Sequence, residues 1–169
     1  MFGRLKNKFR DDKSANVRRA NKMLAETDYL DAAGEVKGLL RAYPDRFEIF
    51  SNDGVREAIE WSDLLNGRWS GQDLRLCLVF VDPQLPEVVL QLSENYNELF
   101  VTAVRERIEY SLVYQLSDIL PSGVVVRGQV RRNADGSLFT QVLTDSTPEV
   151  ADYEAMISFE GELRQAVGL

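Results

Sequence analysis

The middle of the chain constrains the fold most, because two strand patterns there precede the clearest helical pattern in the sequence. Residues 74–81 are apolar apart from Arg75, which is typical of a central strand covered on both faces. Residues 88–92 predict a neighbouring strand. Apolar residues then recur at helical spacing over residues 99–116, and Pro121 ends this predicted long helix. Strands and helices therefore occur together in one α+β chain.

The N-terminal part predicts two short helices joined by a tight turn. Ser14 is a suitable N-cap for a helix that opens at Ala15. A break at Thr27-Asp28 separates it from a second helix, which Pro44 ends. The second helix carries an apolar stripe formed by Leu30, Ala33, Val36, Leu39 and Leu40. These patterns predict a helical hairpin.

The residues of this hairpin resemble a tetratricopeptide repeat. The match rests on Asp28-Tyr29-Leu30-Asp31-Ala32, Val36, Leu39 and Pro44, with Ala20 at the small position of the first helix. Ala32 stands twelve positions before Pro44, as in the family pattern. The resemblance covers residues 15–44, in a single copy. It implies a helical hairpin similar to one repeat of a peptide-binding family.

The remaining segments complete the predicted fold. Residues 46–50 predict a short strand, residues 55–65 a short helical face, and residues 67–72 a loop that bears Trp69. Residues 123–144 predict a β-hairpin, and a last amphipathic helix contains Tyr153, Met156, Ile157 and Leu163. The expected fold is α+β, with an N-terminal helical hairpin and an antiparallel sheet of about four to five strands, packed by the long helix and the C-terminal helix.

Charge is distributed unevenly along the chain. Residues 1–22 hold eight basic and two acidic residues, whereas residues 23–169 hold twelve basic and twenty-five acidic residues. The net charges are therefore +6 and −13, although the whole chain carries only −7. We predict a basic arm over residues 1–13 and one α+β domain over residues 14–169. The expected partner-binding residues of the arm are Phe2, Arg4, Leu5, Lys6, Lys8, Phe9 and Arg10.

The arm has several interpretations. Its apolar and basic residues suit an anionic membrane surface, where each basic residue contributes about 1 kcal/mol. The arm could also dock on a partner, contact nucleic acid or fold back on the acidic body. A solvated terminus without a binding role is the simplest alternative.

Composition excludes much catalytic chemistry. The chain has no histidine, so it lacks Ser-His and Cys-His nucleophile pairs and histidine metal ligands. Its single cysteine, Cys77, lies in the predicted central strand and is interpreted as an inert core thiol. No phosphate-binding glycine loop and no calcium loop is present. We therefore predict a non-enzymatic protein with no catalytic residue, no cofactor and no metal site. Carboxylate chemistry in a hydrolase or transferase is the alternative.

Aromatic and basic residues indicate which partners to expect. Trp69 and Tyr110 stand beside polar neighbours and are candidate partner-binding residues, together with Tyr29. The acidic body repels phosphate, so nucleic acid is disfavoured as a partner. Arg127, Arg131 and Arg132 are interpreted as charges that guard an edge strand.

These features favour a cytoplasmic adaptor or chaperone-like factor that binds another protein or peptide. Neither end of the sequence carries an export signal or an apolar run long enough to span a membrane. Homodimerisation through a sheet edge or the long helix is left open. A peripheral factor held by its arm at the inner face of the membrane is a further alternative.

Overall fold

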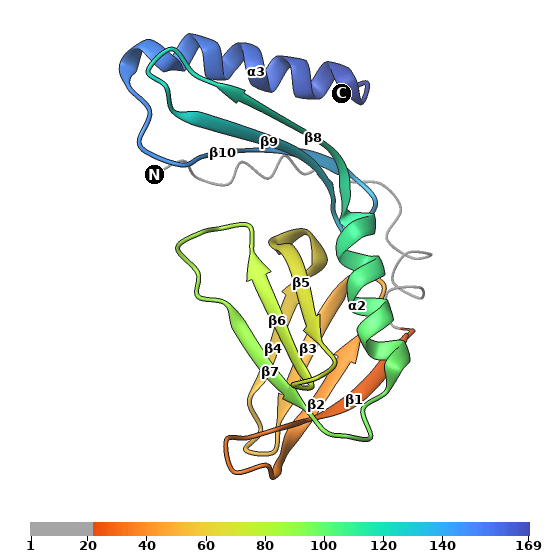
Figure 1. Ribbon diagram of the computed structural model, residues 1–169. Coiled ribbons are helices and arrows are strands. Elements are labelled where there is room, and N and C mark those ends of the chain that lie inside the picture. The colour runs from red at the N-terminus through yellow and green to blue at the C-terminus, as the bar shows by residue number, and fades with distance from the viewer. Residues whose placement is uncertain (1–21) are drawn as a thin grey trace. The chain divides into compact units, whose positions relative to one another are not determined.

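A computed structural model describes residues 22–169 (Figure 1). Their contacts divide the chain into two compact units. The N-terminal unit contains residues 22–111, with 133–135, and the C-terminal unit contains residues 112–132 and 136–169. Each unit is described by itself below. The predicted arm over residues 1–13 lies outside the described residues, and its boundary with one following domain stays a prediction.

The N-terminal unit is a seven-stranded antiparallel sheet followed by a helix. Its elements are β1 (Ala25–Leu30), β2 (Val36–Ala42), β3 (Arg46–Ser51), β4 (Arg56–Glu60), η1 (Trp61–Asp63), β5 (Leu64–Ser70), β6 (Arg75–Phe80), β7 (Val88–Leu92) and α2 (Glu98–Ser111). The strand order is β4-β3-β2-β1-β7-β6-β5. Two consecutive meanders thus join where β1 pairs with β7, and the edge strands β4 and β5 are connected through η1.

Helix α2 packs against β5, β1, β2 and η1 through one apolar face. Phe100, Val104 and Ile108 are the buried apolar residues of this face. The Phe100 ring lies 5.8 Å from that of Phe47, and the Phe47 ring lies 6.0 Å from that of Trp61. Burial of such large side chains provides about 1.5–3 kcal/mol each. The helix is therefore part of the same core as the strands.

The predicted helical hairpin over residues 15–44 is wrong wherever the structure describes it. Residues 25–42 instead form β1 and β2. Asp31 holds the turn between them, because its carboxylate accepts hydrogen bonds from the backbone N–H groups of Ala33 and Glu35, at 2.9 and 3.0 Å. The resemblance to a tetratricopeptide repeat therefore does not hold.

Burial in both strands follows a period of two instead of the helical period. The buried residues are Ala25, Thr27 and Tyr29 in β1, and Gly38, Leu40 and Ala42 in β2. Because alternate side chains of a strand point to one face, this set faces the core. The apolar stripe at helical spacing shares only Leu40 with this buried set, so the helical prediction followed residues that the strands do not bury.

Other predicted elements are confirmed or corrected in turn. The strand over residues 46–50 and the last helix are confirmed, and so is the hairpin over residues 123–144. Residues 55–65 form β4, η1 and the start of β5 instead of a helix, and the long helix ends at Ser111, after which the chain continues as a strand. The α+β class is correct, but the sheet of about four to five strands is replaced by sheets of seven and three strands.

The C-terminal unit is a three-stranded antiparallel sheet with one helix on a face. Its elements are β8 (Leu112–Ile119), β9 (Val125–Arg132), β10 (Leu138–Thr144), η2 (Val150–Asp152) and α3 (Tyr153–Ala166). The order is β10-β9-β8, so β9 is the central strand and the interpretation of its arginines as guards of an edge is wrong. Arg131 is fully buried, and this burial lowers the pKa of its guanidinium to about 10. Its Nε donates a hydrogen bond of 2.8 Å to Gln129.

Glycine at position 128 allows α3 to approach β9. A Cβ at Gly128 would lie 2.1 Å from Leu163 Cδ1 and 2.6 Å from Phe159 Cε1. We expect Gly128→Ala to lower the free energy of unfolding of this unit by about 1–3 kcal/mol, because these side chains must leave their packed positions. Hydrogen–deuterium exchange of β9 and α3 should then become faster.

Gly161 provides the control for this prediction. It lies within α3, and a Cβ there would meet nothing within 4 Å. Gly161→Ala should therefore slow exchange in α3, because alanine favours the helix by up to about 1 kcal/mol over glycine. Equal exchange rates in the two variants would contradict the packing argument.

Candidate functional site

A cavity of about 340 Å³ lies within the N-terminal unit, where α2 passes β5 and β6. Its lining residues are Gly67, Trp69, Leu76, Val101, Thr102, Val104 and Arg105. Leu76 and Val104 are buried core residues, whereas Thr102 and Arg105 are exposed on α2. The cavity therefore has an apolar floor and a polar rim, and its volume falls in the range of small ligand sites.

Strand β5 forms one wall of this cavity and is an edge of the sheet. Within residues 22–169 its only hydrogen-bonded neighbour is β6. An edge strand presents backbone N–H and C=O groups that another strand can pair with. Gly67 has no side chain to cover this wall, and a Cβ there would lie 3.1 Å from Ile108 Cδ1. The glycine thus allows the close approach of α2 to β5.

Trp69 continues the same wall. Its ring is half-buried and packs on the ring of Tyr96, with 4.8 Å between their centroids. Tryptophan and tyrosine combine a large apolar surface with a polar group, and they are frequent anchors of binding surfaces. Trp69 was expected in a loop, but it belongs to β5. This strand fixes its position beside Gly67.

In the part of the chain that the structure describes, Arg105 is the charged residue that lines the cavity. Its side chain is 70% exposed, and its Nε lies 3.8 Å from Glu109 Oε1, a distance longer than a hydrogen bond. This is the ion pair expected from the i,i+4 spacing of the two residues. At that distance and exposure the pair holds the guanidinium only weakly, so Arg105 can turn toward a ligand.

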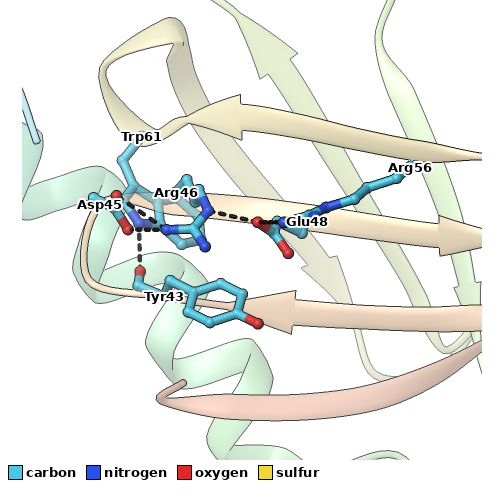
Figure 2. Close-up of polar contacts among 6 residues, drawn as sticks. All are labelled: Tyr43, Asp45, Arg46, Glu48, Arg56 and Trp61. Atoms are coloured by element: carbon cyan, nitrogen blue, oxygen red, sulfur yellow. Dashed lines mark hydrogen bonds and ion pairs between the residues drawn. The ribbon is translucent and has the colours of Figure 1, made fainter. Parts of the chain in front are cut away.

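A second cluster of charged residues lies on the sheet around Glu48 in β3. Figure 2 shows the Glu48 carboxylate between the guanidinium groups of Arg46 and Arg56. Arg46 Nε donates to Glu48 Oε1 at 2.5 Å, and Arg56 Nη2 donates to the same oxygen at 2.7 Å. Arg46 also donates to Asp45 at 2.9 Å. Only 1% of the Glu48 side chain is exposed, so this is a buried carboxylate held by two arginines.

The pKa of Glu48 shows what this cluster can do. Burial by itself raises the pKa of the carboxyl, but hydrogen bonds and the charges of Arg46 and Arg56 outweigh it and lower the pKa below its ordinary value. A general acid or base works best with a pKa near the working pH. Glu48 is therefore an ionised acceptor at neutral pH, and the cluster is suited to holding strands together.

Aromatic rings complete the cluster. The Arg46 guanidinium lies 4.2 Å from the centre of the Tyr43 ring. Arg41 and Arg56 lie 4.6 and 5.1 Å from the centre of the Phe50 ring. Such contacts contribute about 0.5–1 kcal/mol at exposed sites. Together they fix the arginines on the face of β2, β3 and β4.

Cys77 does not occupy the core position predicted for it. In β6, Leu76 and Leu78 are buried, whereas Cys77 is half-buried on the opposite face. Its thiol donates a hydrogen bond of 2.9 Å to Glu87, whose carboxylate also accepts from Arg68 at 2.7 Å. The side chains of β6 are therefore buried on the face of Leu76 and Leu78 and only partly buried on the face of Cys77. The prediction of a strand covered on both faces is wrong.

The predicted partner-binding residues are placed in different surroundings. Tyr29 is buried, and its hydroxyl lies 2.9 Å from Ser51 Oγ. Trp69 lines the cavity, while Tyr110 is 56% exposed on α2 and is not among the lining residues. The other candidates, Phe2, Arg4, Leu5, Lys6, Lys8, Phe9 and Arg10, lie outside the described residues.

Sequence reasoning missed most of the cavity. Gly67 stood in a predicted loop, and Thr102 and Arg105 are polar residues within the predicted long helix. The only signal of the cavity in the sequence was Gly67, two positions before Trp69 in an otherwise polar segment. That signal does not reveal which helix will lie against the glycine and the tryptophan.

Within residues 22–169, no three acidic or cysteine side chains are grouped so that they could hold a metal ion. Neither α2 nor α3, the α-helices of this part of the chain, combines the length and the apolar character that crossing a membrane requires. Comparisons of the chain with protein-family models, curated proteins and solved structures found no match.

Proposed function

We propose that this chain is a non-enzymatic adaptor that binds an extended peptide segment of another protein along β5, in the cavity between β5 and α2. The observation that carries the proposal is that β5 is an edge strand of the sheet and lines a cavity of about 340 Å³. An extended peptide can add to such an edge by backbone hydrogen bonds, while its side chains enter neighbouring pockets.

The two sides of the cavity have complementary roles in this proposal. The backbone of β5 supplies hydrogen bonds that depend little on peptide sequence. Val101 supplies a half-buried apolar contact for one side chain of the peptide, and Trp69 supplies a half-buried aromatic wall. A peptide bound here would thus gain affinity from its backbone and specificity from its side chains.

Carboxylate-dependent catalysis has weaker support. Among residues 22–169, no aspartate, glutamate, tyrosine or lysine lines the cavity. The best-buried glutamate, Glu48, is engaged by two arginines that lower its pKa. The alternatives that depend on the basic arm, including contact with an anionic membrane, stay predictions because residues 1–13 lie outside the described residues.

The proposal is tested by panning a library of random linear peptides on the full chain and measuring the affinity of the enriched peptides by fluorescence anisotropy. We expect Thr102→Trp to weaken their binding by about tenfold or more, because the bulky side chain fills the cavity. Hydrogen–deuterium exchange should also show slower exchange of β5 amides when a peptide is bound, as strand addition requires.

Glu106→Trp is the matched control. Glu106 is exposed on the same helix one turn further on, and it does not line the cavity. Its variant should bind the enriched peptides like the original chain. The proposal fails if no peptide is enriched, or if Thr102→Trp and Glu106→Trp affect binding equally.

A further inference from the structure

The charges of the N-terminal unit indicate which peptides the cavity accepts. Several arginines there hold a carboxylate at hydrogen-bonding distance: Arg41 with Glu26, Arg46 with Asp45 and Glu48, Arg56 with Glu48, and Arg68 with Glu87. Arg105 differs from them, because its ion pair with Glu109 is 3.8 Å long. It also differs in position, since it lines the cavity.

We infer that Arg105 binds a carboxylate of the peptide, so that the cavity selects acidic peptides with a neighbouring apolar side chain. This inference rests on the proposed function. A guanidinium can bind a carboxylate by two parallel hydrogen bonds, which gives both strength and a fixed orientation. The apolar side chain lies against the half-buried Val101 and Trp69, and the aspartate or glutamate lies at the rim formed by Arg105 and Thr102.

The acidic composition of the chain does not prevent this selection. Residues 23–169 carry a net charge of −13, which repels an acidic peptide at long range. At physiological ionic strength charges are screened beyond about 8 Å, however, and the exposed Arg105 lines the cavity itself. Repulsion therefore slows association, while contact with Arg105 decides which peptide is retained.

The inference is tested by panning the same random peptide library on Arg105→Glu, with Arg107→Glu as control. Arg107 lies on the same helix, outside the cavity, with its guanidinium 5.7 Å from the centre of the Tyr110 ring. We expect aspartate and glutamate to be enriched on the original chain and on Arg107→Glu, and lysine and arginine on Arg105→Glu. An acidic peptide should bind Arg105→Glu about tenfold more weakly than the original chain.

The outcomes separate this inference from the proposed function. Peptides that bind in a manner sensitive to Thr102→Trp, but without an acidic preference that Arg105→Glu reverses, would overturn the inference and leave the proposed function intact. If no enriched peptide is sensitive to Thr102→Trp, the proposed function fails and the inference fails with it. Circular dichroism of each variant verifies that its helices are retained.

Discussion

Replacing Glu48 by alanine is expected to lower the free energy of unfolding of the N-terminal unit by about 3 kcal/mol. Only 1% of this side chain is exposed, and its Oε1 accepts hydrogen bonds from Arg46 and Arg56. The variant loses both charge-assisted bonds and leaves a gap in the cluster. This loss of free energy is small for the breaking of a buried ion pair, because Arg46 keeps its hydrogen bond to Asp45 and the Arg56 side chain can turn to solvent. Both tryptophans, Trp61 and Trp69, lie in this unit, so urea unfolding followed by tryptophan fluorescence measures it.

Glu26→Ala is the matched control. Glu26 also pairs with an arginine, Arg41, and stands two strands from Glu48 in the same row of the sheet. Its side chain is 32% exposed, so its removal should cost about 1 kcal/mol or less. Equal losses for Glu26→Ala and Glu48→Ala would show that burial does not strengthen the Glu48 cluster.

The contribution of Glu48 depends on pH. Because its pKa is lower in the folded chain than in the unfolded chain, the unfolded state binds its proton first as the pH falls. The stabilisation is complete above the ordinary pKa of glutamate, about 4.3, and is lost as the pH falls through the lower folded value. The difference in unfolding free energy between the original chain and Glu48→Ala should therefore be largest at neutral pH and shrink in acid.

Local patterns in the sequence predicted some elements well. The strand over residues 46–50 alternates strongly, with Phe47 and Ile49 on one face. The turn of the last hairpin has Gly136 at a φ of 86°, a conformation that glycine adopts without strain. The C-terminal helix was predicted from Tyr153, Met156, Ile157 and Leu163; the helix is confirmed, although Phe159 and Leu163 are its buried residues and Ile157 is exposed. In each case the signal lies within a few neighbouring residues.

Elements that depend on distant partners were not predictable in this way. The small and apolar residues of β1 and β2 fit a helix and a strand equally well, and pairing of β1 with β7 selects the strand, as between Tyr29 and Leu92. The cavity joins Gly67 to residues 101–105, which no local pattern connects. Glu48 likewise resembles an ordinary exposed strand residue until Arg56 of β4 lies beside it.

Gly38→Ala is expected to lower the free energy of unfolding of the N-terminal unit by about 4 kcal/mol, a loss found only where a native arrangement cannot be kept. A Cβ at Gly38 would lie 1.8 Å from the carbonyl oxygen of Phe50 on β3, which is backbone and cannot rotate away. It would also lie 2.9 Å from Tyr29 Cε1. The Tyr29 ring crosses β2 over this glycine and reaches Ser51 on β3, with 2.9 Å between the two hydroxyl oxygens.

Two further variants separate the causes of this loss. Gly34→Ala should cost about 1–2 kcal/mol, because Gly34 has a φ of 82° but open space around its Cβ position. Tyr29→Phe should cost about 1 kcal/mol, the value of one hydrogen bond, because the ring remains over β2. Tryptophan-monitored urea unfolding measures all three variants. If Gly38→Ala lowered the free energy of unfolding no more than Gly34→Ala, β2 and β3 would be able to separate at this point without breaking the sheet. The tight crossing of Tyr29 over Gly38 would then be a consequence of the fold and not one of its requirements.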